Sequence, residues 1–144
     1  MPEFLTGSKA FFSDYKDFQP HDTDVVKFNP NQNHAITYIE KIGHTTFVWK
    51  YNKADNIINY LLNSYKFSSA CVMLLVPDII KEVGMTFDKL PQLKPLIDKL
   101  DDRHKYIEVI YNAYLENGKF ELTKEQLDSA YEEYKRERPN VYNK

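Results

Sequence analysis

The sequence has few of the residues that would define several protein classes. Cys71 is the only cysteine among 144 residues, which excludes an internal disulfide and any metal site built on several thiolates. Because Cys71 stands in an apolar run, we expect it to be a buried small hydrophobe. No run of apolar residues approaches the roughly 20 that a membrane helix needs, so no membrane partner is expected.

A charge of one sign is also missing. The chain carries 19 basic and 21 acidic residues, a net charge of -2. This balance excludes a strong electrostatic footprint for duplex nucleic acid over the whole chain. The first residues lack the basic start and long apolar core of a signal peptide, so a cytoplasmic location is expected.

The length and the 42% hydrophobic content predict one domain, residues 1–144, with a real hydrophobic core. Its fold class is predicted as α+β. Residues 1–52 are expected to form a small mixed sheet with a helix, and residues 53–144 a helical subdomain packed on it. No flexible linker separates the two parts.

Strands are predicted in the first part at residues 3–6, 22–28 and 44–51. The last of these, HTTFVWKY, is rich in β-branched and aromatic residues and has the clearest strand pattern in the chain. Residues 34–42 are predicted as a helix, because their apolar residues fall near helical spacing and Gly43 makes a suitable end.

The second part is predicted as helices from residue 54 onward. Pro77 marks a helix start or a kink. A long helix is expected over about 92–117, ended by Gly118. The last helix is expected to begin at a capping box formed by Thr123 and Gln126.

The most informative stretch joins a Gly-Ser turn to a pair of aspartates. In a strand, residues two apart point to the same face, so Asp22 and Asp24 are expected to point together. Two close carboxylates repel unless a cation lies between them, and Mg²⁺ commonly takes one or two carboxylates plus substrate phosphates. Gly7 allows a phosphate to approach the backbone, and Ser8 can donate to it. A solvated strand edge is the alternative interpretation of the aspartates.

Gly7-Ser8, thirteen further residues and then Asp22-Thr23-Asp24 beside apolar residues resemble the signature of the DNA polymerase β-like nucleotidyltransferase superfamily, in its minimal form. The resemblance implies that Gly7 and Ser8, with Lys9, contact a nucleoside triphosphate. It implies that Asp22 and Asp24 bind Mg²⁺ and are catalytic. The reaction of the superfamily transfers a nucleotidyl group to a hydroxyl.

The resemblance also implies a third carboxylate on a later strand, and residues 44–51 contain neither Asp nor Glu. Lys50 or Val48 would take the corresponding face, and Glu40 is predicted to be helical. The alternative function is therefore a catalytically inactive interaction module with the same fold. The sequence leaves the acceptor open between a protein, an RNA and a small molecule, and it leaves open whether the chain forms a homo-oligomer.

Overall fold

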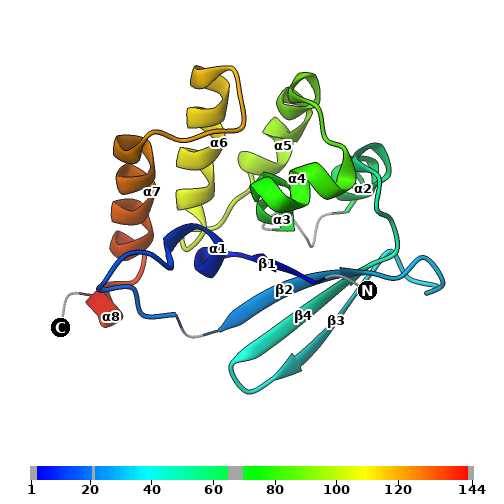
Figure 1. Ribbon diagram of the computed structural model, residues 1–144, viewed down its shortest axis with the longest axis horizontal. Coiled ribbons are helices and arrows are strands. Elements are labelled where there is room, and N and C mark those ends of the chain that lie inside the picture. Colours follow the sequence, from blue (N-terminus) through cyan, green and yellow to red (C-terminus); the bar gives the residue numbers. More distant parts are fainter. Residues whose placement is uncertain (1–2, 21, 65–69, 143–144) are drawn as a thin grey trace. The chain divides into compact units, whose positions relative to one another are not determined.

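Strands occupy the first part of the chain and helices most of the rest, which confirms the α+β class (Figure 1). The computed structural model describes residues 3–20, 22–64 and 70–142. These residues form two compact units, a sheet unit of residues 1–60 and 72–85 and a helical unit of residues 61–71 and 86–144. The sheet unit therefore includes a later segment of the chain as well as its first part.

The sheet unit contains four strands and the helices next to them in sequence. Its elements are β1 Phe4–Thr6, α1 Ser8–Phe12, β2 Thr23–Phe28, β3 Ile36–Lys41, β4 His44–Trp49, most of α2 Ala54–Leu62, most of α3 Cys71–Leu75, and α4 Pro77–Val83. The strand order is β1-β2-β4-β3. The central strands β2 and β4 are parallel, and both edge strands run antiparallel to their neighbours.

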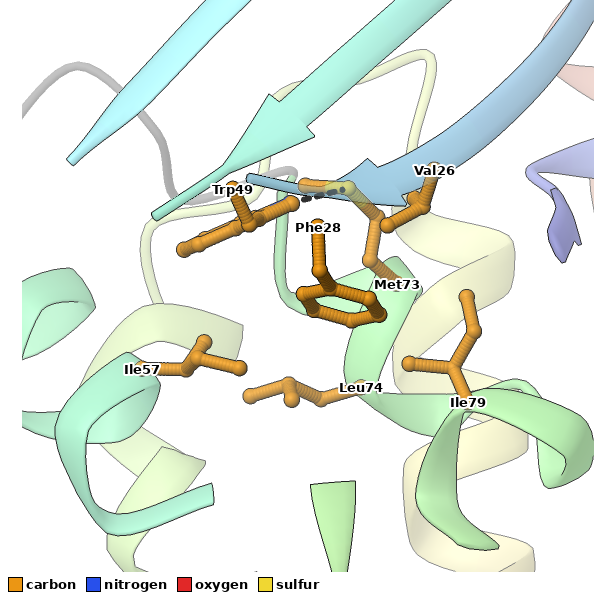
Figure 2. Close-up of a pocket in the computed structure, with 7 residues that line it drawn as sticks. All are labelled: Val26, Phe28, Trp49, Ile57, Met73, Leu74 and Ile79. Carbon is orange, nitrogen blue, oxygen red and sulfur yellow. Dashed lines mark hydrogen bonds between the residues drawn. The ribbon is translucent and has the colours of Figure 1, made fainter. Parts of the chain in front are cut away.

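The face of the sheet that carries Val26, Phe28 and Trp49 is buried against helices of the same unit. Figure 2 shows these side chains around a small apolar cavity, and the indole nitrogen of Trp49 donates to the sulfur of Met73 at 3.0 Å. The residues that line the cavity are Val26, Phe28, Trp49, Ile57, Met73, Leu74 and Ile79. This apolar cluster fixes which face of β2 and β4 is turned inward.

The prediction of a helix over 34–42 is wrong, because residues 36–41 form strand β3. Ile36, Thr37 and Ile39 are β-branched, and β4 supplies an antiparallel partner for the whole segment. Gly43, with φ 73°, completes a two-residue hairpin turn instead of ending a helix. A left-handed glycine suits either structure, so Gly43 could not distinguish them.

The helical unit contains η2 Phe87–Leu93, α5 Lys94–Ile97, α6 Lys105–Asn117, α7 Lys124–Arg136 and α8 Pro139–Tyr142. The prediction of one helix over 92–117 is wrong. The first part ends at Ile97, and α6 begins only at Lys105. Between them the Asp101 carboxylate accepts the backbone N–H of Arg103 at 3.0 Å and contacts His104 at 2.6 Å. Such local bonds compete with the helical ladder.

Other expectations for the helices are confirmed. Pro77 lies in the first turn of α4 and Gly118 caps α6 in a left-handed conformation. Thr123 and Gln126 form the capping box of α7, with bonds of 3.1 and 2.9 Å. Cys71 is fully buried, and burial raises the pKa of its thiol to about 12.

Two acidic side chains meet at the end of α7, where Glu137 follows the helix and Glu133 lies one turn before it. The Glu137 carboxylate accepts the backbone N–H of Tyr106, in the first turn of α6, at 3.1 Å. Burial, and after it the charge of Glu133, raises the pKa of Glu137 from 4.5 to about 7. The folded protein therefore holds a proton on Glu137 more tightly than the unfolded chain does.

This shift predicts how the stability depends on pH. Because the folded pKa lies above the unfolded one, the contribution of Glu137 is full below about pH 4.5 and is lost as the pH rises through 7. Glu137→Gln keeps an acceptor for Tyr106 without the charge. We expect it to raise the free energy of unfolding at pH 8 by about 1 kcal/mol and to change it little at pH 5, measured by urea unfolding.

Glu132→Gln is the matched control, since Glu132 lies on the same helix with an exposed side chain that pairs with Lys135 at 3.0 Å. It should change stability by less than about 0.5 kcal/mol at either pH. Equal pH profiles for the Glu137→Gln variant and the unmodified protein would contradict the assignment.

Candidate functional site

The Gly-Ser turn and the second aspartate lie side by side at one end of the sheet. Strand β1 ends at Thr6, which pairs with Asp24 near the start of β2. Gly7 follows directly, and α1 begins at Ser8. The fold therefore brings together residues that are 17 positions apart in the sequence.

Gly7 lies close to the Asp24 carboxylate. Its φ is 71°, in the left-handed region, and a Cβ at this position would lie 2.8 Å from the Oδ2 atom of Asp24. Real Cβ atoms essentially never approach so closely, so any other residue would have to displace the carboxylate. The backbone conformation thus favours glycine here, and the neighbouring Asp24 carboxylate would have to move to admit a side chain.

Lys9 supplies a positive charge beside the same strand end. Its ammonium group donates to the hydroxyl of Thr23 at 2.6 Å. Helix α1 is held in place by Phe12, which is fully buried and makes edge contacts with Tyr15 and Phe18 at 6.2 Å. The aromatic residues after the turn therefore pack together and support Ser8 and Lys9, and Ser8 itself is half-buried.

The start of β2 is also tied to the hairpin between β3 and β4. The backbone N–H of Thr23 donates to the carbonyl of Gly43 at 2.9 Å. On β4, the buried Thr45 lies opposite Asp24. The site is thus framed by β1 on one side of β2 and by the hairpin on the other.

Asp22 differs from the expected arrangement. Strand β2 begins at Thr23, so Asp22 precedes the strand and is exposed. The strand alternation that places Asp24 on a face of the sheet does not extend to Asp22. Of the two predicted carboxylates, Asp24 is the one that the sheet holds against Gly7.

The structure also changes the search for a third carboxylate. The expectation that Lys50 or Val48 takes the corresponding face is wrong, because Thr45 lies opposite Asp24. Val48, three residues after Thr45, points to the other face, and Lys50 is about 17 Å further along. Glu40, expected in a helix, lies on β3 opposite Thr45. It shares a row with Asp24, with β4 between them and about 10 Å between the Cα atoms. Lys9, whose ammonium group donates to the Thr23 hydroxyl, provides a positive charge at this end of the sheet.

Thr6 is a polar residue that the sequence pattern did not single out. It is 1% exposed, and its hydroxyl has no hydrogen-bond partner among the residues that the structure describes. Thr6, Asp24, Thr45 and Glu40 form one row across the four strands. The pairing of β1 with β2 brings Thr6 there, and no motif in the sequence encodes that pairing.

A divalent cation would find hard oxygen donors at this end of the sheet. Asp24 and Asp22 offer carboxylates, a donor set that suits Mg²⁺ when substrate phosphates and water complete the coordination. Over residues 3–20, 22–64 and 70–142, no group of three or more His, Cys, Asp or Glu side chains gathers to hold a metal without such help. An ion at this end would therefore need phosphate or water oxygens to complete its coordination.

The class that the structure defines is an α+β protein with a mixed sheet in the order β1-β2-β4-β3 and a Gly7–Asp24 contact at one end. No family model, curated protein or solved structure matches this chain. Within the described ranges, no helix is both long and apolar enough to cross a membrane.

The close contact at Gly7 gives a direct test of the site. We expect Gly7→Ala to lower the free energy of unfolding by about 2 to 3 kcal/mol, because the left-handed backbone and the clash with Asp24 both oppose a Cβ. Gly84→Ala is the matched control, since Gly84 has φ 67° with nothing within 4 Å of the added Cβ.

The control should lose only the backbone part, about 1 to 2 kcal/mol. Thermal or urea unfolding of both variants measures the difference. Equal losses of unfolding free energy for the two variants would show that Asp24 does not obstruct a Cβ at position 7.

Proposed function

We propose that this protein binds a nucleoside triphosphate together with Mg²⁺ at the end of the sheet formed by Gly7, Ser8, Lys9, Asp22 and Asp24. The observation that carries the proposal is the contact between Gly7 and the Asp24 carboxylate. The turn expected to hold phosphate and a carboxylate expected to hold the metal are neighbours in space.

Each residue has a defined task in this proposal. Gly7 leaves room for the Asp24 carboxylate beside the turn, and Ser8 would donate to phosphate oxygens. Lys9 now donates to the neutral hydroxyl of Thr23. A phosphate oxygen is a charged acceptor and makes a stronger bond to an ammonium group, so Lys9 would exchange one partner for the other.

Mg²⁺, when bound, would neutralise the phosphate charge between Asp24 and the ligand. In nucleotidyl transfer, the oxygen of an acceptor hydroxyl attacks the α-phosphorus. A new P–O bond forms, the bond to the β-phosphate bridge breaks, pyrophosphate leaves and the hydroxyl proton passes to a base. We propose this transfer as the activity that such a site would support, with the acceptor left open between a protein, an RNA and a small molecule.

One observation favours the alternative, a nucleotidyltransferase fold that acts as an inactive interaction module. Glu40 lies in the same row as Asp24, but strand β4 separates the two carboxylates. Among the described residues, no third metal ligand joins Asp22 and Asp24. The two functions differ in a single readout. Release of pyrophosphate that is lost in Asp24→Asn supports transfer, and binding without release supports the inactive module.

Calorimetry with ATP, GTP, CTP and UTP in the presence of Mg²⁺ tests the binding itself. We expect Asp24→Asn to weaken binding of the preferred nucleotide by at least about 10-fold, because a metal ligand and its charge are both lost. Omission of Mg²⁺ should have an effect in the same direction.

Asp14→Asn is the control, because Asp14 is an exposed carboxylate in the segment after α1 and its removal changes the net charge equally. It should bind as the unmodified protein does. The absence of binding to all four nucleotides, or equal binding by the Asp24→Asn and Asp14→Asn variants, would refute the proposed function.

A further inference from the structure

An aromatic pair lies on the same face of the sheet as Asp24. Tyr38 on β3 and Phe47 on β4 are opposite each other, and their ring centroids are 6.3 Å apart at an angle of 41°. Tyr38 is 56% exposed and Phe47 is half-buried. We refer to these two residues as the aromatic platform.

The register of the strands fixes the face of the platform. Val26 on β2 is opposite Phe47, and Phe47 is opposite Tyr38, so these three side chains form one row. Asp24 stands two residues before Val26 on the same strand, and side chains two apart point to the same face. The row that contains Asp24 and the row that contains the platform are therefore adjacent.

The spacing between the two rows suits one ligand. With about 4.8 Å between strands and 3.3 Å per residue, the Cα atom of Phe47 lies about 8 Å from that of Asp24, and the Cα atom of Tyr38 about 12 Å away. A ribose and its phosphates separate a nucleobase from a metal-bound phosphate by a comparable span. A nucleotide held at Asp24 would thus be long enough to reach the platform.

The side chains on this face differ in exposure from one row to the next, and the exposed Tyr38 is accessible to such a ligand. The next row, Phe28, Trp49 and Ile36, is buried in the core of the sheet unit. In Figure 1, α2 and α4 lie near the end of the sheet where β4 finishes, and the turn between β3 and β4 points away from them. Within the platform row, exposure rises from 1% at Val26 to 56% at Tyr38, so Tyr38 on the edge strand is the ring that a ligand can reach.

We propose that the aromatic platform, Tyr38 with Phe47, stacks on the base of the nucleotide whose phosphates bind at Gly7, Lys9 and Asp24. This inference rests on the proposed function and adds the part of the site that recognises a nucleoside instead of phosphate alone. Stacking on an aromatic ring contributes about 1 to 3 kcal/mol per base. Truncation of Tyr38 should therefore weaken nucleotide binding by roughly 5- to 150-fold.

The experiment compares two ligands and two variants by calorimetry in the presence of Mg²⁺. ATP carries a base, and inorganic tripolyphosphate has the phosphates alone. Tyr38→Ala removes the platform ring, and Ile39→Ala changes the next residue on β3, which is 55% exposed and points to the opposite face. Thermal unfolding verifies that both exposed substitutions leave the fold intact.

We expect Tyr38→Ala to weaken ATP binding roughly 5- to 150-fold and to leave tripolyphosphate binding unchanged. Tyr38→Phe should retain most of the ATP affinity, and Ile39→Ala should affect neither ligand. Unchanged ATP binding by Tyr38→Ala, or an equal loss for both ligands, would overturn the stacking proposal.

The same data separate this proposal from the proposed function. Tripolyphosphate binding that depends on Asp24, with ATP no tighter than tripolyphosphate, supports the phosphate site and overturns the platform. ATP binding that depends on Tyr38 and not on Asp24 supports the platform and overturns the phosphate site. Failure of the unmodified protein to bind either ligand overturns both.

Discussion

The parallel pairing of β2 with β4 is the constraint on which the sheet unit depends. Six residues of each strand are in register, from Thr23 opposite His44 to Phe28 opposite Trp49. The far end of this ladder buries Phe28 and Trp49 in an apolar cluster, which a one-residue slip would turn to the other face. The same register, followed back to the near end, places Asp24 opposite Thr45. Core packing at one end of two strands therefore positions the candidate site at the other end.

Several weak contacts at the near end act together because they share the start of β2. The Gly43 carbonyl accepts the N–H of Thr23, Lys9 donates to the Thr23 hydroxyl, and Gly7 leaves room for the Asp24 carboxylate. Each connects β2 to a different segment of the chain. Together they hold the start of β2 against the turn at Gly7 and against the β3–β4 hairpin.

The helical unit illustrates a different kind of constraint, in which helix ends decide where the elements lie. The Asp101 carboxylate binds the non-helical segment before α6, the Thr123 and Gln126 capping box starts α7, and Glu137 accepts an N–H from the first turn of α6. Glu137 does so at an electrostatic cost, because it lies in a buried position next to Glu133. Arg138 offsets part of this cost, since its guanidinium lies 3.4 Å from the Glu137 carboxylate and 3.8 Å from the ring centroid of Tyr134.

The sequence by itself determined the α+β class, the strands around Asp24 and Trp49, the capping box and the left-handed end at Gly118, because these depend on local residue chemistry. It could not determine that residues 36–41 are a strand, since their spacing fits a helix and only the ladder to β4 decides between them. That ladder is also what places Glu40 and Tyr38 on the face of Asp24. The tertiary structure alone decided the contact between Gly7 and Asp24 and the position of Lys9 on Thr23. Such contacts join residues far apart in the chain, and strand register, which no short motif encodes, sets the distances between them.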